Sequence, residues 1–356
     1  MDTLEKKAEG GRVEVYDWLR LIATVFVVIG HSAYLDLHTE YGGIAYEVPG
    51  TVSWIYTLIT GGGYIDLSRW VYGFHMPLFF MLSGAVLALR PMGTFDEIVK
   101  SKAKRLLIPY FVCGWLFMLP VKRIGNFYNN ESFLQALKGF LSGHDSGHLW
   151  FLAALFWCIV IFVCLKKILS KAKVHSIYAL LFIAGIIQLT YDFLPFDVLK
   201  LKTGLQYIFY FALGYCFEYE RKVRQWNLRK VITAFTIVLA VEILNSRYEI
   251  LDDFFVVLSG SFMAYLLADV CSRIFKRAAD HAVWNLVIRN LFYVYLFHDP
   301  LEYLMLRIFM RPYFLSSSVG CILYVLSRTV GVFVISILLG ICVSRIKSVC
   351  KKWLEY

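Results

Sequence analysis

The sequence predicts an all-α membrane protein: a polytopic bundle of about ten transmembrane helices that forms one domain over residues 1–356. Three observations predict this fold class. Hydrophobic residues make up 59% of the chain and charged residues only 17%, whereas a soluble protein of this length needs a more polar surface. Long apolar stretches recur along the chain, and the Lys and Arg residues gather in alternate segments between them.

The apolar stretches give the expected helices, because about twenty residues of helix cross the core of a bilayer. They lie at residues 16–37, 70–89, 105–120, 149–165, 174–194, 203–219, 229–246, 253–272, 290–308 and 318–344. Several are short or interrupted by polar residues, and we expect their ends to shift by a few residues. No repeat or linker divides them, so the sequence predicts a single domain.

The positive charges predict the orientation. Of the 36 Lys and Arg residues, 25 lie in the alternate segments that include both chain ends, and nine lie in the other segments. Cytoplasmic segments are enriched in Lys and Arg, so we expect both ends in the cytoplasm and a multi-pass protein of the cytoplasmic (inner or plasma) membrane. This distribution accounts for the formal net charge of +10 without nucleic acid, and membrane lipids are the expected partners of the basic segments.

Two further features of the sequence bear on function. The eight cysteines lie in apolar stretches or in the final tail, without a CxxC motif or a Cys/His cluster, so we interpret them as buried hydrophobic residues and expect no metal site. Two segments on the predicted outer side, 38–69 and 121–148, are long. Long loops of compact domains often carry function; the alternative is that these two only connect helices.

The first predicted helix carries a stripe of polar residues. Arg20 and His31 are eleven positions apart, which places them within about 20° of one face and about 16.5 Å apart along the axis. Asp17 and Thr24 fall on the same stripe. Each residue alone has a structural explanation, such as a snorkelling Arg20 paired with Asp17 or a hydrogen bond from His31 to another helix. Their common face favours a functional site that is directed toward a cavity.

The chemistry of the stripe suits an activated, phosphorylated donor. A cation near the inner face would bind phosphates, and a neutral imidazole deeper in the membrane can take a proton from an attacking hydroxyl. A coenzyme A thioester has a matching shape, with a phosphorylated nucleotide at one end of a long thin arm. With this spacing, Arg20 would lie where the phosphates of such a donor bind, and His31 would lie near its reactive end.

Several short blocks of the sequence, beginning on this first helix, resemble the motifs of a known family. Asp17-Trp18-Leu19-Arg20 followed by His31 resembles the R-x10-H motif of the acyltransferase-3 family, whose members are bacterial integral-membrane proteins that commonly O-acylate sugars and glycans. Further blocks match in order along the chain: FHMPLFFMLSG at 74–84, KRLLIPY at 104–110, HLWFL at 148–152 and YLFH at 295–298. The match therefore extends, in order, over most of the chain.

The resemblance implies roles for particular residues. It implies that His31 is catalytic and that Arg20, Lys102 and Arg105 bind acyl-CoA, with acetyl-CoA as the expected donor and no permanently bound cofactor. The family often has an R-x-x-R pair at the start of the third helix, whereas this chain has Lys102 before Arg105 and Ile at position 108. Lysine lacks the planar fork of arginine. The expected supporting residues are Asp17, His75, Ser83, His148, Trp150 and His298.

The supporting residues each have a second interpretation. His75 either forms a hydrogen bond between helices or pairs with His31, and Ser83 belongs to a family motif or to a small-residue packing site. Trp150 is either an interfacial anchor or a carbohydrate-stacking residue. His298 and its neighbour Asp299 form either a fixed hydrogen bond or part of the catalytic site.

Taken together, the sequence predicts a membrane O-acyltransferase. It would move an acyl group, acetyl in the expected case, from cytoplasmic acyl-CoA to a hydroxyl of an extracytoplasmic glycan or sugar. The residues are compatible with direct transfer and with an acyl-histidine step. The alternatives are a transporter or exporter with an intramembrane Arg/His path, and a non-catalytic membrane sensor or anchor domain. Arg328, near the outer end of the last predicted helix, is expected to contact lipid or an anionic acceptor.

Overall fold

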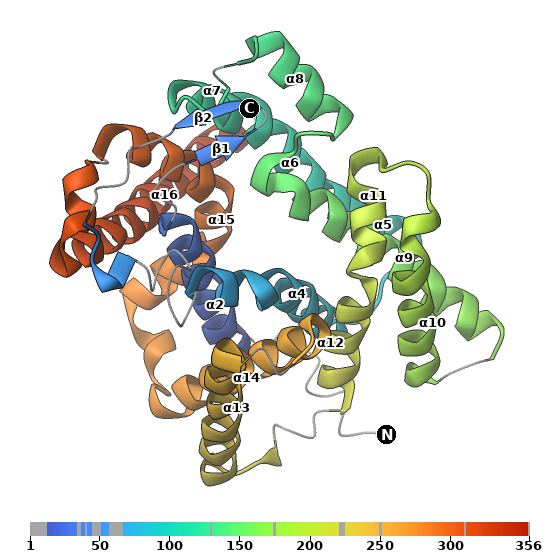
Figure 1. Ribbon diagram of the computed structural model, residues 1–356. Helices are drawn as coiled ribbons and strands as arrows, with labels where there is room; N and C mark the ends of the chain where they lie inside the picture. The colour runs from blue at the N-terminus through green and yellow to red at the C-terminus, as the bar shows by residue number, and fades with distance from the viewer. Residues whose placement is uncertain are drawn as a thin grey trace.

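The computed structural model describes residues 13–33, 37–39, 41–44, 51–56, 67–128, 130–173, 176–220, 225–248, 251–309 and 311–354. Within these residues the chain is helical apart from loops and one short antiparallel hairpin, β1 (Leu37–Thr39) and β2 (Gly42–Ile44). This confirms the all-α fold class. Helix α2 (Glu14–Ser32) lies in the middle of the bundle (Figure 1), where it contacts α4, α14, α15 and α16.

Each predicted apolar stretch overlaps a helix or a run of helices. The longer elements are α4 (Leu67–Ala88), α5 (Phe95–Lys102), α6 (Ile108–Cys113), α7 (Leu119–Ile124), α8 (Phe133–Ser142), α9 (Trp150–Lys171), α10 (Ile177–Thr190), α11 (Leu201–Gln206), α12 (Ile208–Glu220), α13 (Leu228–Tyr248), α14 (Asp253–Ile274), α15 (Ala282–Phe309) and α16 (Ser318–Leu354). Two π-helical turns, η1 (Ala103–Leu107) and η2 (Gly114–Met118), join α5, α6 and α7 into one run. A 3₁₀ turn, η3 (Gly147–Leu149), precedes α9.

Six helical segments within the described residues are long and apolar enough to cross a membrane. They are Glu14–Ser32, Trp70–Ala88, Phe95–Ile124, Phe133–Lys171, Asp253–Ile274 and Ser318–Ser348. Helix α15 has 28 residues but carries Arg289, Asp299, Glu302 and Arg307. These helices indicate an integral membrane protein, while the count of ten crossings and the orientation stay predictions.

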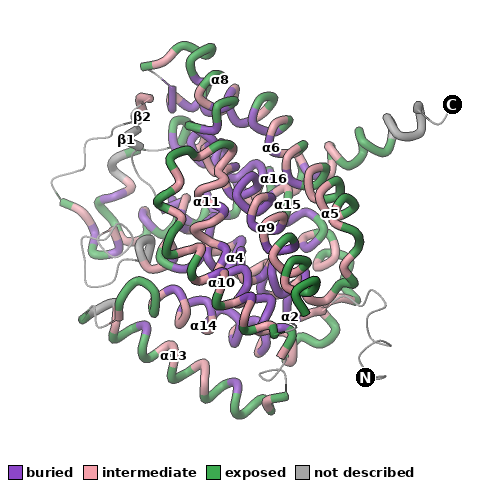
Figure 2. Tube along the Cα trace, turned by 90° about the vertical axis from the view of Figure 1, so that its right-hand side faces the viewer, coloured by how far each residue is buried: buried purple, intermediate pink, exposed green. Residues whose placement is uncertain are grey.

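Large apolar side chains cover much of the outer surface, as expected for a bundle surrounded by lipid. Phe182 on α10, Ile243 on α13 and Leu323 on α16 are among the exposed examples. Buried residues gather on the central helices, whereas α13 and the C-terminal part of α16 are mostly exposed (Figure 2). The polar interior described below is therefore enclosed by an apolar exterior.

Two glycines bring α4 and α12 into direct backbone contact. A Cβ atom at Gly84 would lie 2.0 Å from the carbonyl oxygen of Phe211, and one at Gly214 would lie 1.9 Å from that of Met81. No larger residue fits at either position without separating the helices, which is the reason small residues line tight helix contacts in membranes. The contact fixes α4, the helix that carries His75 and Ser83, against the bundle.

Candidate active site

A buried carboxylate on α15 gathers three basic side chains from distant parts of the chain. Asp299 Oδ1 lies 3.4 Å from Nδ1 of His31, at the end of α2. Its other oxygen, Oδ2, lies 2.9 Å from Nζ of Lys122 on α7 and 3.0 Å from Nδ1 of His148 on η3. Because an isolated buried carboxylate is costly, these partners are what allow Asp299 to lie inside the bundle.

His31 opens onto a large cavity. Its side chain is 16% exposed, and it lines a cavity of about 910 Å³ together with His75, His148 and His298. The His31 ring lies 5.0 Å from the His298 ring, centroid to centroid. Aromatic and amide side chains also line this space: Tyr72, Trp150, Gln188, Gln206, Tyr207, Tyr210 and Tyr303. We call this space the histidine cavity.

Arg328 fixes the end of α2 that carries His31. Its guanidinium donates to the carbonyl oxygens of Ser32 (2.7 Å) and His31 (3.4 Å), groups that a helix C-terminus leaves without partners. Nη2 also lies 2.8 Å from Oε2 of Glu302, which accepts a hydrogen bond from Ser32 Oγ at 2.6 Å through Oε1. The expected contact of Arg328 with lipid or acceptor is therefore wrong: the side chain is 1% exposed, because an arginine inside an apolar bundle needs a carboxylate partner.

The sequence predicts that Lys122 lies in an outer loop, whereas in the structure its side chain is buried in the bundle. Helix α7 continues the run from α6 as far as Ile124, so Lys122 is still helical and its side chain is only 1% exposed. Its ammonium lies 4.3 Å from the centroid of the Phe127 ring and 4.8 Å from that of Tyr303. The apolar residues around Lys122 are the one feature of the local sequence that is consistent with this burial.

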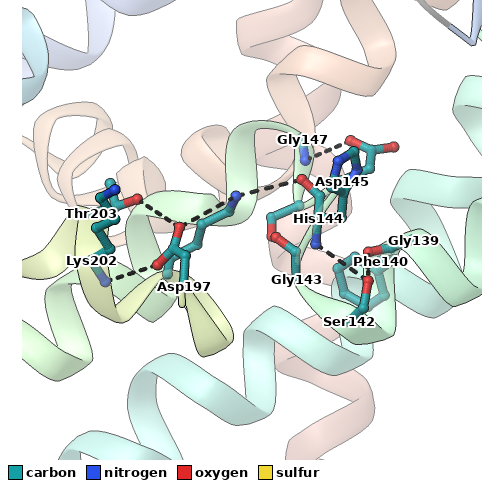
Figure 3. Close-up of polar contacts among 12 residues, drawn as sticks. Gly139, Phe140, Ser142, Gly143, His144, Asp145, Gly147, Asp197, Lys202 and Thr203 are labelled. Atoms are coloured by element: carbon teal, nitrogen blue, oxygen red, sulfur yellow. Dashed lines mark hydrogen bonds and ion pairs between the residues drawn. The ribbon is translucent and has the colours of Figure 1, made fainter. Parts of the chain in front are cut away.

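Glycine 147 leaves room for Lys122. Its φ is +47°, a backbone conformation that side chains disfavour, and a Cβ there would lie 2.9 Å from Lys122 Nζ. The carboxylate of Asp145 fixes the same turn, since it accepts from the Gly147 N–H at 3.2 Å and from Tyr128 Oη at 2.6 Å. Figure 3 shows this turn, with Asp145 beside Gly147. The Lys200 ammonium also donates to the His144 carbonyl at 3.4 Å.

The ordered turn holds His148 in one orientation. Nε2 of His148 donates to the carbonyl of Leu296 at 3.0 Å, and Tyr295 Oη donates to the carbonyl of His148 at 2.7 Å. Both bonds join η3 to α15, the helix that carries Asp299. The segment 121–148 thus supplies two of the three basic side chains around the carboxylate.

A second cavity, of about 480 Å³, is lined by positive charge. Its five cationic residues are Arg20, Arg90, Lys102, Arg105 and Arg289. Ser83 and Thr24 also line it, and the described part of the chain contributes no acidic side chain to its wall. Such a set of donors suits phosphate groups. We call this space the cationic cavity.

The two cavities share a wall. Phe79 and Tyr295 line both of them. The ring of Phe151, which lines the cationic cavity, lies 5.8 Å from the Phe79 ring and 5.7 Å from the Tyr295 ring. Phe79 and Tyr295 therefore form the shared wall, and Phe151 packs against both of them.

The structure divides the residues that the sequence singled out between these two spaces. Arg20, Ser83, Lys102 and Arg105 line the cationic cavity; His31, His75, His148, Trp150 and His298 line the histidine cavity. Asp17 lines neither, and its Oδ1 lies 3.4 Å from Arg20 Nη1. The Nδ1 of His75 bonds to the carbonyl of Val71 on its own helix, at 3.0 Å. Sequence reasoning missed Lys122, Arg90 and Arg289.

Comparison with known families decides what kind of protein carries these cavities. Residues 13–344 match the acyltransferase-3 family, which is described as an acyltransferase domain. The chain belongs to the acyltransferase-3 family. No curated protein and no solved structure matches this chain.

Family membership makes this chain a membrane acyltransferase and favours group transfer over a transport function. In this acyltransferase-3 protein the two residues of the R-x10-H block line different cavities, on either side of the aromatic wall. Ile108, which departs from the family pattern, is 55% exposed on the surface of the bundle. Isoleucine at position 108 therefore does not reduce the number of cations in the cationic cavity. Arg90 and Arg289 also contribute their positive charges to this cavity.

Proposed function

We propose that this acyltransferase moves an acyl group, acetyl in the simplest case, from cytoplasmic acyl-CoA to a hydroxyl of a sugar or glycan on the opposite side of the membrane. One observation carries the proposal: a cavity lined by five cations and a cavity lined by His31 share two aromatic wall residues, Phe79 and Tyr295. Donor binding and acyl transfer would then take place on the two sides of that wall.

The phosphates of coenzyme A would bind in the cationic cavity. Arg20 and Lys102 line it together with Arg105, and bonds between such cations and phosphate oxygens are among the strongest hydrogen bonds in proteins. The positive-inside pattern of the sequence supports a cytoplasmic position for this cavity. Because Arg20 and His31 are about 16.5 Å apart along α2, the donor's extended arm would pass the rings of Phe79 and Tyr295 to bring its thioester to His31.

His31 would then act as the general base. It takes the proton of the acceptor hydroxyl as the hydroxyl oxygen bonds to the thioester carbon. The carbon–sulfur bond breaks, and the imidazolium returns the proton to the leaving thiolate, so that an ester and free coenzyme A result. Asp299, 3.4 Å from His31 Nδ1, would orient the ring and stabilise the imidazolium, as the carboxylate of a catalytic triad does.

An acyl-histidine intermediate is a second route through the same residues. The His31 ring would bond to the thioester carbon and release coenzyme A, and the acceptor hydroxyl would receive the acyl group in a second step. The two routes differ in one observable. Only the second leaves labelled acyl on the protein when labelled acetyl-CoA is supplied without an acceptor.

The wall of the histidine cavity supports a carbohydrate acceptor. Trp150 and Tyr207 offer ring faces, with centroids 5.7 Å apart, and aromatic residues combine apolar area with a polar group. Gln188 and Gln206 add amide groups that can donate and accept hydrogen bonds. This combination matches the apolar faces and hydroxyl edges of a sugar ring.

The experiment that tests the function compares single variants in permeabilised membranes. Labelled acetyl-CoA is added to membranes that contain the host's envelope glycans, and label in the glycan fraction is measured. We expect His31→Ala to lower transfer by about 10²–10⁴-fold, the usual contribution of a general base. His281→Ala, an exposed residue that lines neither cavity, is the matched control. Undiminished transfer by His31→Ala would remove His31 from the mechanism.

A further inference from the structure

A second histidine in the same cavity has an unused hydrogen-bond acceptor. His298 is 1% exposed and lines the histidine cavity, where its ring lies 5.0 Å from that of His31 and 5.2 Å from that of His148. Among the residues that the structure describes, none is a hydrogen-bond partner for its Nε2 atom. Buried polar atoms are nearly always paired, so an unpaired one on a cavity wall points to a ligand.

The backbone decides what kind of partner Nε2 needs. Nδ1 of His298 lies 2.8 Å from the carbonyl oxygen of Tyr295. A carbonyl oxygen can only accept, so Nδ1 carries the hydrogen. In the neutral ring Nε2 is then a lone-pair acceptor. The missing partner is therefore a donor such as a hydroxyl group.

We propose that Nε2 of His298 binds a second hydroxyl of the acceptor, next to the one that reacts. This inference rests on the proposed function, in which the reacting hydroxyl gives its proton to His31. A single hydroxyl has one hydrogen, so it cannot also donate to His298. The two rings lie 5.0 Å apart, a separation that two hydroxyls on adjacent carbons of a sugar ring can bridge. His298 is thus a positioning residue that selects acceptors with a vicinal pair of donors.

Replacing His298 with asparagine or with glutamine distinguishes acceptor binding from a structural role. In His298→Asn the side-chain amide can keep the Nδ1 bond to Tyr295 but offers nothing at the position of Nε2. In His298→Gln the amide can reach the position of Nε2 and loses the bond to Tyr295. A structural role would be preserved by Asn and lost with Gln, whereas a role in acceptor binding gives the reverse order.

The test measures transfer from labelled acetyl-CoA to the host's envelope glycans in permeabilised membranes. We expect His298→Asn to lower transfer at least tenfold, with the thermal midpoint and the KM for acetyl-CoA unchanged, and His298→Gln to retain more transfer than Asn. Equal transfer by wild type and Asn, or greater transfer by Asn than by Gln, would overturn the proposal. A wild type that labels no glycan would instead refute the proposed function on which it rests.

The product gives an independent readout that needs no variant. NMR of the acylated glycan from the wild-type reaction locates the ester. We expect it on a carbon whose neighbour carries a free hydroxyl or an amide N–H. An ester on a carbon whose neighbours carry neither group would overturn the proposal even if the variants behaved as expected.

Discussion

Lys122 and Asp299 form an ion pair inside the bundle, with Nζ 2.9 Å from Oδ2 and both side chains at most 3% exposed. The pair joins α7 to α15. It satisfies one oxygen of the carboxylate and leaves Oδ1 toward His31. The ion pair matters for the site because burying an unpaired carboxylate is costly. Lys122 offsets this cost through Oδ2, so the other oxygen of Asp299 can face the imidazole of His31.

Removing one member of this pair should destabilise the protein strongly. We expect Lys122→Met to lower the free energy of unfolding by about 3–5 kcal/mol, the typical effect of removing one member of a buried ion pair. The double variant Lys122→Met/Asp299→Asn should regain part of that loss. Denaturant unfolding in detergent measures both, with the exposed Lys138→Met as the control. A loss no larger than that of the control would contradict the buried pair.

Replacing Gly147 should disturb the same pair through the backbone. A side chain at φ +47° costs about 1–2 kcal/mol, and a Cβ there would lie 2.8 Å from Met118 Sδ and 2.9 Å from Lys122 Nζ. We therefore expect Gly147→Ala to lower both the thermal midpoint and acyl transfer. Gly139→Ala is the matched control, because its Cβ would only make ordinary contact, 3.7 Å from Asp145. Similar behaviour of the two variants would refute the assigned role of Gly147.

Arg328 should affect catalysis without touching substrate. It holds the carbonyls of His31 and Ser32, so Arg328→Lys, which lacks the planar fork, should lower kcat for transfer while the KM for acetyl-CoA stays unchanged. The double variant Arg328→Met/Glu302→Met should be more stable than Arg328→Met alone, because it leaves no unpaired carboxylate. Steady-state kinetics and thermal unfolding check the two statements. An increased KM with an unchanged kcat would show that Arg328 acts on the donor instead.

The cationic cavity should control donor affinity. We expect Arg20→Gln and Lys102→Gln each to raise the KM for acetyl-CoA by about tenfold or more, since a hydrogen bond to a charged group is worth about 1.5–3 kcal/mol. Added salt should raise the wild-type KM and have less effect on the variants. Lys104→Gln, exposed and outside the cavity wall, is the control. A KM for these variants equal to that of the control would exclude the cavity as the donor site.

Much of the fold could be predicted because membrane helices are marked by local composition. The positions of α2, α9 and α14 follow from their apolar runs. The ends of the helices were harder to predict. Helix α15, for example, begins at Ala282, eight residues before the predicted stretch, and its many polar residues weaken the apolar signal. Two of those residues, Asp299 and Glu302, are buried in the interior, and the composition of a single sequence does not distinguish such a stretch from a loop.

The site was predictable where its residues share one helix. Periodicity placed Arg20 and His31 on one face, and the structure has them lining adjoining cavities. Lys122 and Arg289 were not predictable, because their place at the site depends on how α7 and α15 pack, and no local pattern carries that information. Asp299 was noticed only as the neighbour of His298, although it is the group that brings the basic side chains together.

The most direct test of the central claim is the sidedness of transfer in sealed inside-out membrane vesicles. Labelled acetyl-CoA, which does not cross the membrane, is added to the outer medium that faces the cytoplasmic side of the protein. The account predicts labelled glycan inside the vesicles, protected from a glycan-degrading enzyme added outside, with the wild-type protein and not with His31→Ala. Label that appears only on glycans open to the outer medium, or transfer that persists in His31→Ala, would contradict it.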